Sequence, residues 1–281
     1  MRLPSTWKQL VLGVLVGSTW TSIAFADEKA ATEPKSDAVA PRSIGFPNKG
    51  SLSGGVRLET SDALQAAREN RWGLPVLVGL VERAAARVAD KHPGAILVVG
   101  DLSRQAGGEI KNHDSHESGR DVDLGFYLVK DGEPFITEEH LVIDREGSAR
   151  YKSGVTFDDA RNWTLVESLL MDRDARVMQI FVANHLRVRL MREARRANAT
   201  ADVLERARAV IVAPRTGQRH DDHFHVRIRC PKGQTDCVDF PARRFVKAAA
   251  SSSAPAAKSV KKKATKKAPA RGAKPKRQRR T

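Results

Sequence analysis

The sequence predicts an α+β fold, in which strands and helices are mixed without a regular βαβ rhythm. Two kinds of segment support this prediction: short runs rich in β-branched residues, typical of strands, and longer runs with apolar residues at helical spacing. The 281 residues, of which 41% are apolar, suffice for one sizeable domain or at most two small ones. We expect one domain over residues 43–248.

Residues 1–26 are expected to be an export signal and not part of this domain. A positively charged start, MRLPSTWK, precedes the uncharged apolar stretch QLVLGVLVGSTWTSIAF. At the end of this stretch, Ala24-Phe25-Ala26 has the small-x-small pattern of a cleavage site. The apolar stretch is short for a spanning helix. We therefore expect cleavage after about Ala26 and a periplasmic or secreted product, with an uncleaved membrane anchor as the alternative. Residues 27–42, polar with Ala and Pro, are expected to be a linker.

The elements of the domain are predicted in chain order from local patterns. Residues 43–60, rich in Gly and Ser, should form an ordered but irregular start. Apolar residues at helical spacing predict helices over residues 74–91, 158–171, 184–196 and 200–209. Apolar runs with β-branched residues or strict alternation predict strands over residues 95–101, 121–129, 177–183 and 223–230.

The net charge of +16 belongs mainly to the C-terminal end of the chain. Residues 249–281 contribute 12 Lys and Arg and no acid, and residues 1–26 contribute 2, so residues 27–248 carry only +2. The low-complexity tail, residues 249–281, is expected to be disordered and to bind an anionic surface of the cell envelope. The export signal argues against nucleic acid as its partner, and a solvated charge run is the alternative.

The two cysteines, Cys230 and Cys237, are expected to form a short disulfide loop. In an oxidising compartment, a pair seven residues apart favours a disulfide. A metal site would need further ligands close by, and no histidine lies inside the loop.

Five of the eight histidines lie in two short segments, and the first of these is a predicted strand. In the sequence HFHV, His223 and His225 are two residues apart, so they lie on one face of the strand, while Phe224 and Val226 face the core. A metal ligand beside a second functional base would have this arrangement. Two histidines on a solvated strand face are the alternative.

The second segment is NHDSHESGRDVDLG. His113 and His116 lie in its turn, and Asp121 and Asp123 share one face of the strand that follows. A loop histidine and a strand aspartate can therefore meet across the turn. The alternative is a polar turn in which Asp123 pairs with an arginine.

Together, the two segments supply the ligands for a catalytic zinc ion. Such an ion takes three protein ligands of His, Asp or Glu type and leaves a fourth position open, and His116, Asp123 and His225 make up this set. His223 remains beside them, where a general base would stand. Nitrogen and oxygen ligands without a thiolate suit zinc and hydrolysis.

The same residues resemble a known family. His116 and Asp123 in the spacing H-x6-D, with H-x-H at 223–225, are similar to the LAS metallopeptidases, and more closely to the penicillin-insensitive murein endopeptidases. The blocks SHESGRDVDLG and HDDHFHVRIRCP carry the resemblance, which covers most of residues 43–240.

The resemblance implies a periplasmic enzyme that cleaves D-alanyl-meso-diaminopimelate cross-links of peptidoglycan, with a central antiparallel sheet flanked by helices. It implies one zinc ion held by His116, Asp123 and His225. It also implies that His223 is the catalytic base and that His220 is a further histidine of the site, which in its protonated form would stabilise the oxyanion.

Three further residues are expected near the site. His113 matches a histidine of the family block, and Asp121 is a candidate to orient a ligand histidine. Asp222 lies three residues before His225, where the dipeptidases of the LAS group have a glutamate base, so a D,D-dipeptidase or carboxypeptidase remains an alternative. A non-catalytic, zinc-bound cell-wall or polyanion-binding module is the alternative of another class. No particular oligomeric state is predicted.

The other histidines and the strand arginines are expected to be structural or solvated. His92 should lie at an exposed helix end, His140 on the surface, and His185 at a helix cap. Arg227 and Arg229 should point outward from the last strand into solvent.

Overall fold

The computed structural model describes residues 40–214 and 218–240. Its described residues up to Asp239 belong to one compact unit. The expected export signal, nearly all of the expected linker, and the basic tail lie outside the described residues.

The fold is α+β, as predicted, and is built around a six-stranded sheet with the order β12-β11-β13-β7-β6-β4. The four middle strands are β11 (Val177–Phe181), β13 (His223–Ile228), β7 (Asp121–Gly125) and β6 (Leu97–Val99). Each pair of neighbours among these four is antiparallel. The two edge strands pair in parallel: β12 (Ile211–Val212) with β11, and β4 (Leu64–Ala66) with β6.

The sheet is therefore mixed, and the prediction of an antiparallel sheet holds for its centre but not for its edges. Parallel neighbours need a crossover connection. The helix α1 (Pro75–Lys91) lies in the connection from β4 to β6, and α3 (Asn184–Arg196) and α4 (Ala201–Val210) lie in the connection from β11 to β12.

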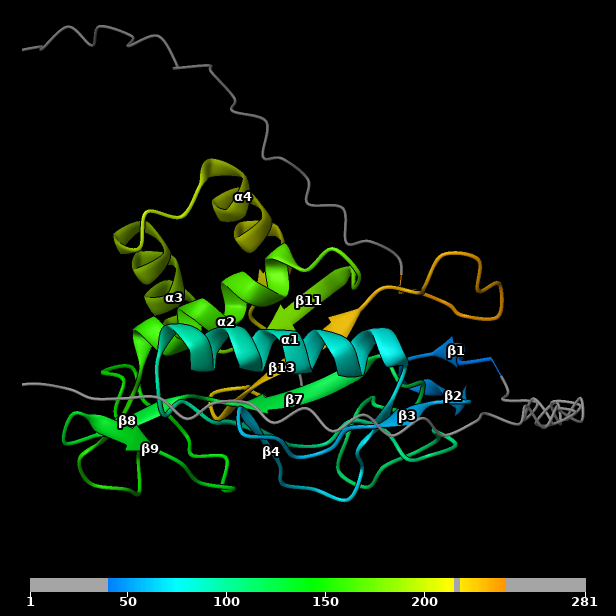
Figure 1. Ribbon diagram of the computed structural model, residues 1–281, viewed down its shortest axis with the longest axis horizontal. Coiled ribbons are helices and arrows are strands. Elements are labelled where there is room, and N and C mark those ends of the chain that lie inside the picture. Colours follow the sequence, from blue (N-terminus) through cyan, green and yellow to red (C-terminus); the bar gives the residue numbers. More distant parts are fainter. Residues whose placement is uncertain (1–39, 215–217, 241–281) are drawn as a thin grey trace, which may run out of the picture. The chain divides into compact units, whose positions relative to one another are not determined.

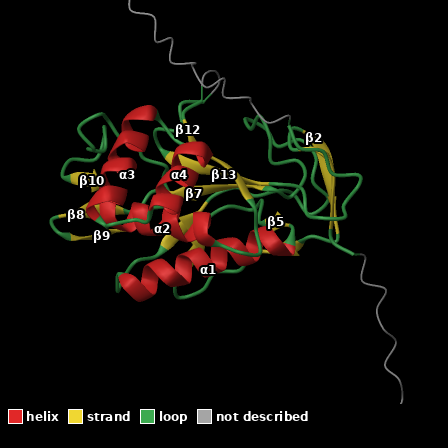
Figure 2. Ribbon diagram, turned by 90° about the horizontal axis from the view of Figure 1, so that it is seen from above, coloured by secondary structure: helices red, strands yellow, loops and turns green. Residues whose placement is uncertain are grey.

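The described residues contain four helices, each of which begins and ends within one residue of its predicted range. The helix not yet named is α2 (Asp159–Met171). Figures 1 and 2 show α1 and α2 side by side against the central sheet. Spacings of three and four residues put the buried side chains of α1 on one face, as an amphipathic helix requires. These side chains are Leu77, Val78, Leu80, Val81, Ala84, Ala85 and Val88. No helix in the described part of the chain is long and apolar enough to cross a membrane.

The N-terminal segment contains strands that the sequence did not predict. β1 (Arg42–Phe46) and β2 (Lys49–Ser53) form an antiparallel pair, and β3 (Val56–Arg57) pairs with β5 (Trp72–Gly73). The Gly and Ser content of β1 and β2 hides them, because these residues are not enriched in strands, and β3 and β5 are only two residues long. β1 begins at Arg42, the last residue of the expected linker.

The predicted strand over residues 121–129 is divided in two. β7 ends at Gly125, and β8 (Leu128–Lys130) pairs instead with β9 (Glu133–Phe135) and β10 (Val155–Phe157) in a separate three-stranded sheet. The segment between β9 and β10 includes His140, which proves important for the site.

The two faces of β7 and β13 have different roles. Val122 and Leu124 of β7, with Phe224 and Val226 of β13, are fully buried in the same apolar core as the helices. Because side chains alternate along a strand, the residues between them lie on the opposite face. That face carries the polar residues of the predicted site.

Candidate metal centre

The pairing of β7 with β13 brings the two predicted segments together. In this antiparallel ladder His225 is the partner of Asp123, and Arg227 is the partner of Asp121. Directly paired residues have their side chains on the same face, with Cβ atoms roughly 5 Å apart. The register therefore produces the meeting of strand histidine and strand aspartate that the zinc prediction requires.

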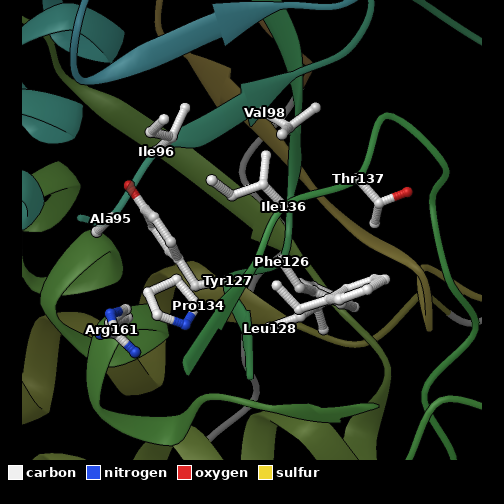
Figure 3. A pocket seen from close by; sticks show the side chains of 11 residues that line it. Ala95, Ile96, Val98, Phe126, Tyr127, Leu128, Pro134, Ile136, Thr137 and Arg161 are labelled. Carbon is white, nitrogen blue, oxygen red and sulfur yellow. The ribbon is translucent and has the colours of Figure 1, made fainter. Parts of the chain in front are cut away.

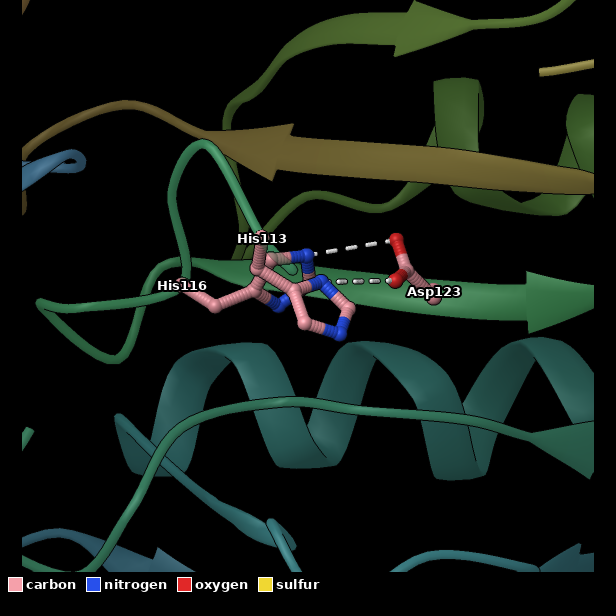
Figure 4. A group of neighbouring side chains, drawn as sticks. All are labelled: His113, His116 and Asp123. Atoms are coloured by element: carbon pink, nitrogen blue, oxygen red, sulfur yellow. Dashed lines mark ion pairs between the residues drawn. The ribbon is translucent and has the colours of Figure 1, made fainter. Parts of the chain in front are cut away.

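His113 and His116 reach the same place from the loop before β7. Figure 4 shows both rings directed at the carboxylate of Asp123. The backbone of His116 has a left-handed φ of 76°, which is rare for a non-glycine residue and concentrates at functional sites. Ser103 holds this loop, because its hydroxyl donates to the carbonyl oxygen of His116 and accepts from the Gly119 amide.

Three donor atoms form a small triangle. His116 Nε2 lies 3.3 Å from Asp123 Oδ1 and 3.2 Å from His225 Nδ1, and His225 Nδ1 lies 3.0 Å from Asp123 Oδ1. A tetrahedral zinc ion with bonds of about 2.0–2.1 Å separates neighbouring ligand atoms by roughly 3.3 Å. Asp123 Oδ1 is buried and makes no hydrogen bond, although these nitrogens surround it. The triangle therefore fits a metal ion.

The second nitrogen of each histidine in the triangle is held by an acceptor. His116 Nδ1 donates to the carbonyl oxygen of Leu102 at 2.8 Å, and His225 Nε2 donates to Asp121 Oδ1 at 2.9 Å. Each bond fixes the tautomer that leaves a lone pair on the nitrogen of the triangle. Asp121 therefore has the orienting contact expected of it.

The buried charged groups of the site shift one another's pKa values. Burial disfavours the carboxylate of Asp123, but His116 and His223 outweigh this effect and keep its pKa well below the ordinary value. Burial lowers the pKa of His225, but the nearby carboxylates of Asp121 and Asp123 have the larger combined effect and raise the pKa to about 9. A cation in the triangle would displace this proton, as metal binding to histidine generally does.

His113 lies at the edge of the triangle and is held by a residue that the sequence analysis missed. Its Nε2 lies 3.2 Å from Asp101 Oδ2, while its Nδ1 lies 3.6 Å from Asp123 Oδ2. The bond to Asp101 outweighs burial and raises the pKa of His113. Asp101 also accepts from Asn70 Nδ2 at 2.7 Å. Asp101 stands at the end of the strand predicted over residues 95–101, and this position was a sequence signal that could have pointed to it.

His223 lies beside the triangle, as predicted. Its Nδ1 donates to Asp222 Oδ1 at 2.7 Å, and its Nε2 lies 3.5 Å from Asp123 Oδ1. Burial lowers the pKa of His223, but Asp123 and Asp222 outweigh it and raise the pKa above its ordinary value.

His140, expected on the surface, lies against this site instead. Its ring stacks on that of His223, with centroids 4.9 Å apart and an interplanar angle of 28°. A Cβ at Gly100 would lie 3.0 Å from His140 Cε1, so a glycine at this position leaves the space that the ring occupies. Because that glycine is on a distant part of the chain, the charged sequence around His140 could not reveal the contact.

His220 lies in the site, and its surroundings disfavour the protonated form in which it was expected to act. Its ring centroid is 5.0 Å from that of His223 and 5.5 Å from that of His225. Burial, followed by the charges of these two histidines, lowers its pKa to about 4. Its Nδ1 donates to the carbonyl oxygen of Gln218 at 3.0 Å. In neutral His220, Nε2 is therefore a hydrogen-bond acceptor, and the ring carries no positive charge that would stabilise an oxyanion.

Two further expectations about solvent exposure are also wrong. Arg227 is only 6% exposed, and its Nε donates to Asp121 Oδ1 at 2.6 Å, because the face of the sheet that carries the site is covered as well. His92 is half-buried and its Nε2 lies 3.0 Å from Thr164 Oγ1. Arg229 is exposed, as predicted.

The predicted disulfide between Cys230 and Cys237 is formed, with Cα atoms 5.7 Å apart. The loop it closes is tied to β1, because Gly45 donates to the carbonyl oxygen of Asp236 at 2.8 Å and accepts from Val238 at 3.0 Å. The disulfide therefore fixes the end of β13 to the start of the domain.

A separate hollow lies between β6, β8 and β9 (Figure 3). Its lining is mostly apolar, with Ile96, Val98, Tyr127, Pro134 and other side chains, and contains no histidine. It therefore offers none of the donors of the candidate metal centre.

An α+β sheet that brings three histidine and aspartate donors within coordinating distance defines a protein with a candidate metal centre. The comparison with known sequences is more specific. The chain belongs to the penicillin-insensitive murein endopeptidase family, whose model matches residues 43–280. It is therefore a member of a peptidase family.

Curated relatives agree with this assignment. A penicillin-insensitive murein endopeptidase of Yersinia pestis bv. Antiqua is 29% identical over 209 residues, which cover 72% of this chain and 71% of that protein. Proteins of the same name from Escherichia coli O139:H28 and Shigella boydii serotype 18 are 26% identical over 244 residues, which cover 82% of this chain and 80% of theirs.

Proposed function

We propose that this chain is a zinc-dependent murein endopeptidase that acts in the periplasm and hydrolyses D-alanyl-meso-diaminopimelate cross-links of peptidoglycan. Family membership supports the reaction class and peptidoglycan as the substrate. The observation that supports zinc dependence is the triangle of donor atoms, whose sides of 3.0–3.3 Å fit a tetrahedral ion.

His116, Asp123 and His225 would hold the ion, with His113 as a further side chain at its edge. A bound zinc ion supplies a Lewis acid, which polarises a carbonyl group and makes a water molecule acidic near neutral pH. Asp121 contributes by keeping the lone pair of His225 Nδ1 directed at the triangle.

His223 is the proposed general base. In the neutral ring, Asp222 holds the Nδ1 proton, so Nε2 carries the lone pair and faces Asp123 at the edge of the triangle. From there it can take a proton from the attacking water and return it to the leaving amine. Neutral His220, with Nε2 as an acceptor, would bind a donor group of the substrate and would not stabilise an oxyanion.

The contact between Asp222 and His223 bears on the dipeptidase alternative. A glutamate-type base at this position would need a free carboxylate oxygen directed at the triangle. Asp222 instead accepts the Nδ1 proton of His223 at 2.7 Å, which favours an orienting role and hence the endopeptidase.

The flanking segments complete the proposal. Residues 1–26 would direct export and be removed after about Ala26, residues 27–42 would link the mature end to the peptidase domain (43–248), and residues 249–281 would bind an anionic envelope surface. The basic composition of the tail supports the last assignment.

The test is digestion of purified cross-linked muropeptide dimers, with and without a chelator, by the wild-type protein and by His225→Ala. His185→Ala is a matched control, because His185 is a half-buried histidine whose Nε2 donates to the carbonyl oxygen of Ile143. We expect dimers to become monomers, except with chelator or in His225→Ala, and zinc to restore the chelated protein.

Other outcomes would replace the proposal. Release of terminal D-alanine or of a dipeptide without loss of dimers would indicate the carboxypeptidase or dipeptidase. Zinc binding without any cleavage would indicate the non-catalytic module. Cleavage that survives removal of all metal would contradict the role of the triangle.

A further inference from the structure

A second group of metal-binding side chains lies beside the first and shares no residue with the triangle. It consists of His140, Asp222 and His223, and one donor atom from each lies within 4.8 Å of the others. The rings of His140 and His223 are 4.9 Å apart, close to the 4.8 Å between the rings of His116 and His225. Two histidines and one carboxylate are also a complete ligand set for zinc.

One atom of this group lacks a partner. His140 Nε2 is buried and makes no hydrogen bond within the described part of the chain. Leaving a buried polar atom without a partner destabilises a protein, and coordination of a metal ion is one way to satisfy such an atom. The space at Gly100 and the stacked ring of His223 hold the His140 imidazole in this position.

We propose that His140, Asp222 and His223 form a second metal site, which binds zinc or a similar divalent transition-metal ion and thereby inhibits the enzyme. This inference rests on the proposed function, because inhibition follows from the role of His223 as general base. An ion bound to His223 occupies the imidazole that must accept a proton, and it takes Asp222 away from its orienting contact.

The geometry makes this site weaker than the triangle. Its donor atoms lie up to 4.8 Å apart, against 3.0–3.3 Å in the triangle. They must therefore approach one another by up to about 1.5 Å to reach the spacing of zinc ligands. The hydrogen bond of 2.7 Å between Asp222 and His223 must also be given up. Activity should therefore rise as zinc fills the triangle and fall at higher zinc, as the second site fills.

The first measurement counts bound metal and needs no enzymatic activity. Purified, metal-stripped protein is dialysed against increasing Zn²⁺, and the bound zinc per chain is determined for wild type, His140→Ala and Asp222→Asn. His92→Ala is the control for histidine binding outside the site, since His92 is also half-buried. We expect two ions in the wild type and in the control, and about tenfold or more weaker binding of only the second ion in the two variants.

The second measurement follows turnover of muropeptide dimers at increasing Zn²⁺ concentration. The rate of each protein is expressed as a fraction of its own highest rate. Inhibition should require at least about tenfold more zinc in His140→Ala than in the wild type. A single bound ion throughout the wild-type titration overturns the inference, and so does a second ion that binds equally to all variants. If the second ion is lost in the variants but no protein cleaves dimers, the proposed function fails while the metal site stands.

Discussion

Replacement of Asp121 by Asn should weaken metal binding without removing a proposed ligand. Asp121 Oδ1 accepts from His225 Nε2 at 2.9 Å and from Arg227 Nε at 2.6 Å. Asparagine has the same shape and keeps an acceptor for both donors, but it removes the negative charge. His225 Nδ1 should then be a poorer donor, because the carboxylate no longer supports the charge that metal binding places on the ring.

Two magnitudes follow from these contacts. Changes in such outer contacts reduce metal affinity about 10–100-fold, which is about 1.4–2.7 kcal/mol. The variant should also lose stability, because Arg227 is only 6% exposed and loses its charged partner. Removal of one member of a buried ion pair costs about 3–5 kcal/mol, and the retained hydrogen bond should bring the loss to the lower end of this range or below it.

Metal affinity and stability are measured separately, by competition with a chelator and by urea unfolding of the metal-free protein. Asp239→Asn is the matched control, because Asp239 pairs with the fully buried Arg120 at 2.7 Å and touches no proposed ligand. Both variants should lose stability, but only Asp121→Asn should lose affinity for zinc. Equal affinities for zinc in Asp121→Asn and the wild type would refute the reasoning.

Three further predictions concern the rest of the chain. Cys230→Ser with Cys237→Ser should lower the free energy of unfolding by about 2.5 kcal/mol, the loop-entropy value, and an unchanged urea midpoint would contradict it. Burial, followed by the charge of Arg161, lowers the pKa of His92 in the folded protein. Because His92 is then protonated more readily in the unfolded chain, the free energy of unfolding should fall as the pH drops below 6.5. His92→Gln should not lose stability in this way. If its free energy of unfolding differs from that of the wild type by the same amount at pH 7 and at pH 5, the prediction is wrong. Deletion of residues 249–281 should weaken binding to anionic vesicles at low salt and spare turnover of soluble dimers, and unchanged vesicle binding would rule out this role.

The sequence predicted best what depends on neighbouring residues. Alternation in DVDLG and HFHV was enough to assign Asp121 with Asp123, and His223 with His225, to common faces, because the period of a strand is two residues. The helices were predicted almost to the residue for a similar reason. The three ligands that a catalytic zinc ion needs suggested that the two segments meet, and the resemblance to murein endopeptidases supported this; no local pattern contains the strand pairing itself.

What the sequence could not predict is which parts of the chain cover each face of the sheet. Arg227 points away from the apolar core, as predicted. Other parts of the chain cover this face of the sheet, however, so Arg227 is buried and donates to Asp121. The same applies to His140, whose position depends on the space at Gly100, some 40 residues earlier in the chain. This covering matters for chemistry, since burial prevents water from satisfying Asp123 Oδ1 and keeps the imidazole nitrogens around it. A strand pattern therefore predicts which side chains can meet, but only the packing of distant loops makes them a set of ligands.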